Sequence, residues 1–373
     1  MKKFLLGFGV SLLLLGCQSS QDILPEDKTP LKIGAIVPLT GDGASYGVLV
    51  QDVANLIVDP LNTAGGINGR TLKIVWEDGK CAPSDASRSA QKLIGIDKVS
   101  IILGGVCSGE TLGAAPITEK NKVILLSPVS TSPEVTTAGD YVFRTAPSDS
   151  SQGKVLAEYA NAHFKKIGIL GEQTDYALGV ANTFEENFTG EVLRESYLST
   201  ESDFRTRITK LKNADIEAVL LIPQTYPKFD IIAKQLDEQA WSKPILTNEI
   251  ITGDGGVSNY VGLLTRTNAI GANFKEPDTP SFKKMVSDYN GKYSKNPDLL
   301  NYAATTADAV NVLIQILKQT ADSTDTESIK NALYGLNGFE GMYGPIVFDS
   351  NGDVNIAHQL FSFDGEKFVP LAE

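Results

Sequence analysis

Histidine and cysteine are scarce in this sequence, and acidic residues outnumber basic ones. The 373 residues include two His, three Cys, and 45 acidic against 33 basic residues, for a net charge of −12. A serine hydrolase needs a histidine base, yet the only candidates are His163 and His358, for which structural or surface roles are the simpler interpretation. The acidity, without a basic cluster, argues against nucleic-acid binding. We therefore expect no catalysis, and we find no support for a metal or cofactor.

Apolar runs long enough to cross a membrane are also absent. The longest run follows two lysines at the N-terminus and ends at Gly16, which is the pattern of an export signal rather than of a permanent span. Residues 14–17 (LLGC) resemble the bacterial lipobox, in which cleavage precedes a cysteine that becomes lipidated. An ordinary signal peptide with a chance cysteine is the alternative. We expect residues 1–16 to be a signal peptide, Cys17 to carry lipid, and residues 17–30 to be a tether, so that the protein is exported and membrane-anchored.

The two remaining cysteines are candidates for a disulfide. Cys81 follows an expected strand at residues 70–78, and Cys107 follows the neighbouring strand, so both lie in turns at the same edge of a sheet. Exported proteins fold under oxidising conditions, which favours a disulfide over two free thiols.

Short apolar runs alternate with amphipathic stretches along most of the chain, which is typical of an α/β fold with parallel sheets. Strands, helices and turns recur in two series of similar length, which predicts two lobes of the same architecture. Three later helices, at residues 281–293, 300–319 and 326–334, have no full sheet of their own. We therefore expect the chain to return to the first lobe. The tail predicts two hairpins, with turns at Asn351-Gly352 and Asp364-Gly365.

Residues 100–134 read as strand, polar turn, helix, strand and polar turn. Small hydroxyl residues end both strands, at Ser108 after the first and at Ser127, Ser130 and Thr131 after the second. In open α/β sheets, ligands bind at the carboxyl ends of the strands, so this stretch predicts half of a small-molecule site. Ser108 acting only as a helix cap is the plainer interpretation.

Two other motifs have weaker support. Glycines at positions 41, 43 and 47 follow a strand, but their spacing misses the dinucleotide-binding fingerprint. Residues 349–353 (DSNGD) resemble a fragment of a calcium loop, but Leu360 stands where the bidentate acid is needed, so a hairpin turn is the better interpretation.

Several of these pieces resemble the periplasmic solute-binding proteins of branched-chain amino acid ABC transporters. The resemblance runs from Lys32 to the final hairpins, and its most specific parts are residues 62–78, the two cysteine positions, Ser108 after Cys107, and residues 127–134. It implies a type I fold in which three hinge crossings join two doubly wound lobes, with the ligand in the cleft between them. The implied lobes are residues 31–147 with 275–349, and 148–274 with 350–373. It also implies that the partner is an ABC permease and that the protein is a monomer.

The resemblance also implies a ligand site. Ser108 and Thr131 would bind an α-carboxylate, while the Val129 carbonyl and Glu249 would bind the α-ammonium. The side-chain pocket would be lined by Tyr46, Val106 and Tyr302, with Tyr176 and Thr225 on the opposing lobe. Val129 stands where the leucine-binding pattern has alanine, and Thr225 where it has an aromatic residue.

These departures leave the ligand side chain open, although an aliphatic amino acid is the leading expectation. A binding protein for amides or other small polar solutes and a sensor module of the same fold are the main alternatives. An exported hydrolase is a further one.

Overall fold

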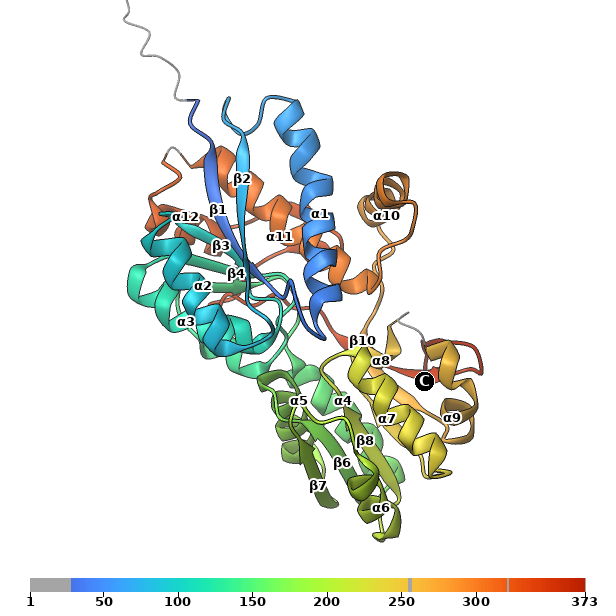
Figure 1. The fold of residues 1–373 in the computed structure, drawn as a ribbon. Coiled ribbons are helices and arrows are strands. Elements are labelled where there is room, and N and C mark those ends of the chain that lie inside the picture. The colour runs from blue at the N-terminus through green and yellow to red at the C-terminus, as the bar shows by residue number, and fades with distance from the viewer. Residues whose placement is uncertain (1–27, 254–256, 321, 373) are drawn as a thin grey trace, which may run out of the picture.

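We analysed a computed structural model that describes residues 28–253, 257–320 and 322–372. The predicted signal peptide and Cys17 lie outside these residues. The chain forms two α/β units, one above the other in Figure 1, with a separate sheet in each. We call the five-stranded sheet with the helices around it the first lobe, and the seven-stranded sheet with its helices the second lobe. No helix in the described part of the chain has the length and apolarity needed to cross a membrane.

The sheet of the first lobe is entirely parallel, in the order β2-β1-β3-β4-β5. Its strands are short and mostly buried on both faces, as parallel sheets covered by helices require. They are β1 (Leu31–Val37), β2 (Leu72–Asp78), β3 (Ile101–Gly104), β4 (Ile124–Ser127) and β5 (Val142–Arg144). The order reverses at β1, so the turns after β1 and β3 lie side by side at the edge where ligands bind in such sheets.

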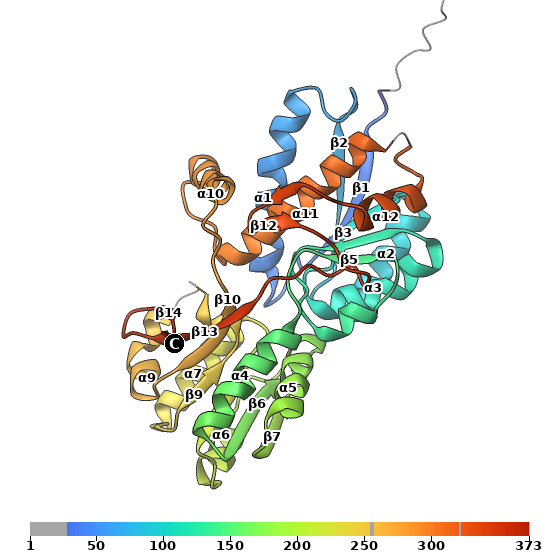
Figure 2. The same cartoon turned by 180° about the vertical axis from the view of Figure 1, so that it is seen from behind.

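Helices from two distant parts of the chain surround this sheet, as Figures 1 and 2 show. From the N-terminal part come α1 (Ala44–Thr63), α2 (Pro83–Gly95), α3 (Ser108–Asn121) and the short 3-10 helix η1 (Pro133–Thr137). The later helices are α10 (Pro280–Tyr293), α11 (Leu300–Gln319) and α12 (Thr326–Tyr334). Because α11 contacts α1 and α12 contacts β4, the predicted return to the first lobe is confirmed. Pro60 lies inside α1, which continues to Thr63.

The second lobe has the sheet order β14-β13-β10-β9-β8-β6-β7. The five strands β6 to β10 pair in parallel, whereas β13 is antiparallel to β10 and β14 is antiparallel to β13. The strands are β6 (Lys166–Glu172), β7 (Glu191–Tyr197), β8 (Ala218–Ile222), β9 (Ile245–Thr247), β10 (Ile270–Phe274), β13 (His358–Phe363) and β14 (Phe368–Pro370). The helical segments are α4 (Asp149–His163), α5 (Asp175–Asn187), α6 (Arg205–Asn213), α7 (Tyr226–Glu238), α8 (Glu249–Thr252), η2 (Val257–Tyr260) and α9 (Val261–Arg266).

The chain passes between the sheets three times, after β5, after β10 and before β13, which gives the expected three crossings. The residue-level boundaries of the lobes stay a prediction.

The hairpin predicted at Asp364-Gly365 is present between β13 and β14, but the one at Asn351-Gly352 is wrong. The paired hairpin there is β11 (Phe339–Gly341) with β12 (Gly344–Ile346). Residues 349–353 instead form a turn bound to Arg144, whose backbone N–H donates to the Gly352 carbonyl at 2.9 Å. Its guanidinium also donates to both carboxylate oxygens of Asp353 at 2.7 Å. This buried ion pair replaces strand pairing as the anchor of the segment.

Candidate functional site

A cavity of about 300 Å³ lies between the lobes, at the ends of the strands. Seven of the nine ligand residues predicted from the sequence line it: Tyr46, Val106, Ser108, Val129, Thr131, Tyr176 and Tyr302. The structure adds three residues that sequence reasoning missed: Cys107, Gln224 and Ile250. Each is a chain neighbour of a predicted residue, which is the only sequence signal that could have indicated them. The structure thus brings most of the predicted residues together, while their roles toward a ligand stay predictions.

The turns of the first lobe are held by hydroxyl groups that bond to one another and to the backbone. Ser127 Oγ donates to the Gly105 carbonyl at 2.7 Å and accepts from the Ser130 N–H at 3.0 Å. Ser130 Oγ lies 2.6 Å from Thr111 Oγ, so this serine is fully occupied within the protein. The network fixes the loop on which Val129 and Thr131 stand. Ser127 and Ser130 therefore position the site rather than face it.

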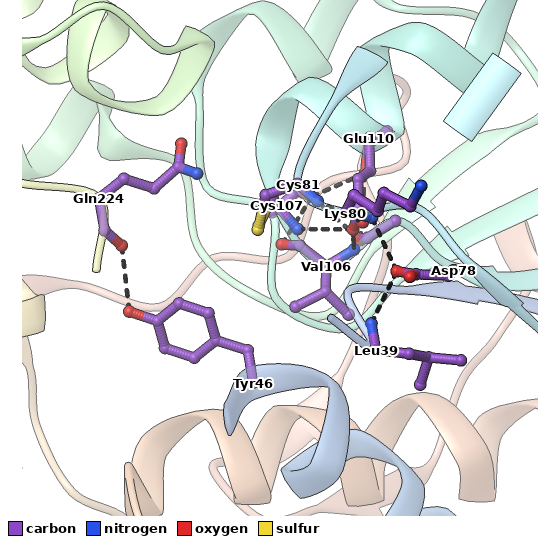
Figure 3. The surroundings of a disulfide bond; sticks show 12 residues. Leu39, Tyr46, Asp78, Lys80, Cys81, Val106, Cys107, Glu110 and Gln224 are labelled. Carbon is purple, nitrogen blue, oxygen red and sulfur yellow. Dashed lines mark hydrogen bonds between the residues drawn. A yellow bond between two sulfur atoms is a disulfide. The ribbon is translucent and has the colours of Figure 1, made fainter. Parts of the chain in front are cut away.

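A buried carboxylate, that of Glu110, joins the two cysteine turns beneath the cavity (Figure 3). Its Oε1 accepts the N–H of Cys81 at 3.0 Å, and its Oε2 accepts those of Val106 at 2.9 Å and Cys107 at 3.1 Å. Gly105 has no side chain to obstruct it, since a Cβ there would lie 2.3 Å from the Cβ of Glu110. Burial raises the pKa of Glu110 to about 7, although the three N–H donors act in the opposite direction.

The predicted disulfide between Cys81 and Cys107 is present, with Cα atoms 5.1 Å apart. Cys107 is the N-cap of α3, and its backbone N–H is one of those that Glu110 accepts. Ser108 is the first residue inside the helix, so the interpretation of Ser108 as the cap is wrong. Its hydroxyl accepts the N–H of Ser132 at 3.2 Å and lines the cavity. The N-terminus of α3 therefore opens onto the cavity, and a helix N-terminus favours negative charge.

Glu249 is the first residue of α8 and is only 3% exposed, unlike the usual solvated loop acid. Its carboxylate accepts hydrogen bonds from Tyr176 Oη at 2.7 Å, from Tyr302 Oη at 2.8 Å and from Gln152 Nε2. Burial raises the pKa of Glu249, and these three donors lower it again by favouring the ionised form. The sequence predicted Glu249 and both tyrosines here, but it missed Gln152.

The two lobes touch around the cavity. Tyr46 of the first lobe donates its hydroxyl to the Gln224 carbonyl of the second lobe at 3.0 Å, as seen in Figure 3. Tyr302 on α11 reaches Glu249 in the same way, and its ring meets that of Tyr46 edge-on, with centroids 6.5 Å apart. Burial is the main cause that raises the pKa of both tyrosines, so they stay neutral donors. The cleft is therefore closed, and its closing contacts involve the predicted site residues themselves.

Two predicted site residues do not line the cavity. Glu249 reaches it only through its hydrogen bonds to Tyr176 and Tyr302, which do line it. The other is Thr225. It is the N-cap of α7, is buried, and borders a more open part of the cleft near Cys81 rather than the cavity. Its hydroxyl has no hydrogen-bond partner.

Glu249 borders a second, more open hollow, on the side toward Phe274 and Leu299, and Tyr302 borders both spaces. Nothing in the sequence pattern indicated this space.

Neither histidine serves the cavity as a catalytic base. His358 is buried on β13, and its Nδ1 lies 2.5 Å from Ser151 Oγ, whereas His163 ends α4 and is exposed. Among residues 28–253, 257–320 and 322–372, no group of His, Cys, Asp and Glu side chains could hold a metal ion. The arrangement around the cavity offers hydrogen bonds and charge, which suit binding.

Comparison with known proteins identifies relatives over nearly the whole chain. A family model described as "Periplasmic binding protein" matches residues 30–365. The Leu/Ile/Val-binding protein homolog 1 of Brucella abortus (strain 2308) is 30% identical over 329 residues, covering 86% of each chain.

Solved structures give the same result for the fold. The branched-chain amino acid transporter substrate-binding protein LivJ of Streptococcus pneumoniae, solved with isoleucine, is 27% identical, with a TM-score of 0.77 over 91% of this chain and 97% of that one. An ABC transporter solute-binding protein of Rhodopseudomonas palustris BisB5, solved with 3,4-dihydroxybenzoic acid, is 22% identical, with a TM-score of 0.77 over 93% and 97% of the two chains. The second likeness supports the fold alone. The fold is thus shared by proteins crystallised with quite different ligands.

Proposed function

The chain belongs to the periplasmic binding protein family, of the type that includes the leucine/isoleucine/valine-binding proteins, and from this premise we propose that it captures an α-amino acid in the closed cleft. The ligand is branched-chain or otherwise aliphatic, and the protein delivers it to the permease of an ABC importer without catalysis. The position of Glu249 carries the proposal. A buried carboxylate that is hydrogen-bonded to two tyrosines of the cavity wall, and is held in orientation by three donors in all, is suited to an ammonium group.

The other end of the ligand is assigned to the first lobe. Ser108 and Thr131 line the cavity at the N-terminus of α3, where backbone N–H groups and the helix dipole favour a carboxylate. The Val129 carbonyl assists Glu249 with the ammonium. An amino acid thus places its negative end on the first lobe and its positive end on Glu249 of the second. Such a ligand stabilises the closed cleft because its contacts are complete only there.

The cavity wall favours an apolar side chain. Val106, Val129 and Ile250 supply aliphatic surface, and the tyrosine rings supply most of the rest. The larger Val129 narrows one wall compared with the leucine-binding pattern. An aromatic acid such as dihydroxybenzoic acid, the ligand of one structural neighbour, fits this cavity less well, because it carries no positive charge to meet Glu249.

A thermal-shift panel of the common amino acids tests the proposal. The chain from residue 18, which keeps every described residue, is unfolded and refolded beforehand to remove any bound ligand. We expect leucine, isoleucine or valine to raise the melting temperature, because a ligand that binds only the folded state stabilises it. Benzoate and its hydroxylated derivatives are included in the same panel. Stabilisation by these acids, with no response to any amino acid, would overturn the proposal.

We further propose that the mature protein is a lipid-anchored monomer at the cell envelope, with residues 17–30 as its tether. Fatty-acid labelling in cells is then expected to mark the wild type and not a Cys17→Ala variant. An unlabelled wild type would show that Cys17 carries no lipid. A permease pull-down separates transport from sensing by a receptor.

A further inference from the structure

Arg144, the last residue of β5, is a buried charge that the proposed function does not use. Its side chain is fully buried, and each of its three guanidinium nitrogens donates a hydrogen bond. Nε and Nη2 donate to the two carboxylate oxygens of Asp353, both at 2.7 Å. Nη1 donates to the Ser132 carbonyl at 2.8 Å, and Nη2 also donates to Thr136 Oγ1 at 2.7 Å. Because a guanidinium is planar and its donors have fixed directions, these three partners are held in one fixed arrangement.

Ser132 belongs to the turn that carries the proposed carboxylate site. It follows Thr131 in the chain, and its N–H donates to Ser108 Oγ at 3.2 Å. Its carbonyl accepts from Arg144 and also from the N–H of Val135 at 3.1 Å, where η1 begins. Ser132 therefore lies between the guanidinium and a hydroxyl that lines the cavity, and it is bonded to both.

Asp353 belongs to the third crossing between the lobes. Arg144 also donates its backbone N–H to the Gly352 carbonyl at 2.9 Å, so this crossing lies beside β5 before it enters the second lobe (Figure 2). Gly352 has a φ of +78°, and a Cβ at this position would lie 2.3 Å from the Val142 carbonyl, so only glycine allows the close approach. Asp349 fixes the Asp353 backbone in turn, because its carboxylate accepts the Asp353 N–H at 3.0 Å. One side chain thus joins the third crossing to the turn after β4.

We propose that Arg144 is a positioning residue of the carboxylate site. By holding Ser132 and Asp353 on one rigid group, it keeps Ser108 and Thr131 in their binding geometry while the crossings bend during closure of the cleft. The inference rests on the proposed function and deepens it, because it concerns the same carboxylate site. Arg144 does not line the cavity, so it acts through Ser132 rather than on the ligand.

The test is a pair of double-mutant cycles on leucine affinity, measured by calorimetry on the stripped chain from residue 18. Arg144→Lys keeps the charge but removes the planar fork, and we expect leucine to bind about tenfold more weakly, as for the loss of a hydrogen bond to a charged group. In a Ser108→Ala background the same change should cost less than about threefold, because the hydroxyl that Arg144 positions is gone. In a Tyr176→Phe background it should again cost about tenfold, since Tyr176 serves the other end of the ligand.

Arg207→Lys is the matched control. Arg207, on α6 of the second lobe, also donates to both carboxylate oxygens of an acid, Glu201, and to a backbone carbonyl, that of Ser196. It does not line the cavity, so its replacement should leave leucine affinity unaltered. Equal losses from Arg144→Lys in both backgrounds, or no loss in the wild type, would overturn the inference, because a merely structural role does not depend on Ser108.

Hydrogen exchange of the ligand-free protein tests the positioning without any ligand. In Arg144→Lys the amides of residues 131–136 should exchange at least about tenfold faster than in the wild type, whereas those of α5 stay unchanged. Thr136→Val removes a single acceptor of Arg144, so it should show the same pattern more weakly, and it serves if Arg144→Lys folds poorly. Unchanged exchange in both variants would overturn the inference. Failure of the proposed function looks different, since the wild type would then bind no amino acid while the exchange pattern remained.

Discussion

The two lobes satisfy their buried polar groups in different ways. In the first lobe, Ser127, Ser130, Thr111 and Glu110 bond to each other or to the backbone around the cleft. In the described part of the chain, every buried side-chain nitrogen or oxygen that has no partner belongs instead to the second lobe: atoms of Asp149, Gln152, Tyr197, Thr225, Asn248, His358 and Gln359. Among the described residues, the buried polar side chains of the first lobe therefore all have hydrogen-bond partners, whereas several in the second lobe have an atom without one.

This difference suggests that the two lobes contribute to ligand binding in different ways. Fully bonded turns keep their geometry whether or not a ligand is present, so the carboxylate site that we propose on the first lobe would be preorganised. Unpaired polar groups raise the free energy of the second lobe. Glu249 already accepts three hydrogen bonds, and under the proposed function the ligand's ammonium adds the counter-charge. Under that proposal, ligand binding and lobe closure are coupled mainly through the second lobe.

Among the changes that test this difference between the lobes, we expect substitution of Glu249 to have the largest effect, on ligand affinity. In Glu249→Gln the cleft loses the carboxylate that we propose pairs with the ligand's ammonium, so a bound ammonium is left unpaired. We expect binding to weaken by about 3–5 kcal/mol, as for other broken buried charge pairs, with little loss of stability. Calorimetry with leucine checks this. Unchanged affinity removes Glu249 from the site.

The next effect concerns the stability of the first lobe. Replacing Cys81 and Cys107 by serine removes a cross-link between residues separated by 26 positions, and such a cross-link is worth about 3 kcal/mol in the chain-entropy model. The free energy of unfolding should fall by about this amount in urea titrations of the double variant. The reduced wild type is the control. A double variant as stable as the oxidised wild type contradicts the account.

Glu110 should make the free energy of unfolding fall as the pH rises, which is opposite to the effect expected from His358 in the second lobe. Its folded pKa of about 7 lies above its ordinary value of 4.5, so its contribution to stability is fully present below pH 4.5 and is lost as the pH rises through 7. The difference amounts to roughly 3 kcal/mol. Urea titrations between pH 4.5 and 8 should show this loss in the wild type and a flatter profile in Glu110→Gln. Equal slopes in both proteins would mean that the three N–H donors dominate.

His358, in the second lobe, should make the protein less stable as the pH falls. Its folded pKa of about 3 lies below its ordinary value of 6.5, so its contribution is present above pH 6.5 and is lost as the pH falls toward 3. At pH 5.5 the loss is about 1 kcal/mol. His358→Asn keeps a polar atom near Ser151 and should reduce the acid-side loss in thermal melts. An unchanged acid limb would show that other groups cause it.

The smallest effect is expected from a matched pair of threonines. Thr225 has an unpartnered buried hydroxyl, so Thr225→Val should change the stability by less than about 1 kcal/mol, or raise it. Thr111 donates its hydroxyl to the Gly105 carbonyl at 3.1 Å, so Thr111→Val should lower the stability by about 1–2 kcal/mol. Urea midpoints of the two variants give the comparison, and it fails if Thr225→Val is the more damaging.

Local patterns in the sequence were sufficient to predict most of the fold. Short β-branched runs bounded by glycine or proline are the parallel strands of the structure. Residues 364–365 form the turn of the antiparallel hairpin β13-β14, as predicted. The hairpin at residues 351–352 failed because its anchor is Arg144, more than 200 positions away, and no local pattern reports such an ion pair. The helix α1 continues past Pro60 to Thr63, because a proline in the last turn interrupts little of the helix.

The candidate site was predictable where residues follow strand ends, and not where partners come from elsewhere. Ser108 and Thr131 lie in turns that follow strands and line the cavity, whereas Glu249 was predicted only through the family resemblance. Gln152 lies on α4, and only the tertiary fold brings it to Glu249, so sequence reasoning missed it. Thr225 was placed by analogy with a larger aromatic residue, and a shorter side chain does not reach the same cavity.

The most direct test of this account is a pair of calorimetric titrations on the stripped wild-type chain from residue 18, with leucine and with 4-methylpentanoate. The two ligands share the carboxylate and the apolar side chain, and they differ only in the ammonium group that the second lobe is proposed to need. The account predicts clear binding of leucine and at least about 100-fold weaker binding of 4-methylpentanoate. Equal affinities, or tighter binding of the deaminated acid, would contradict it.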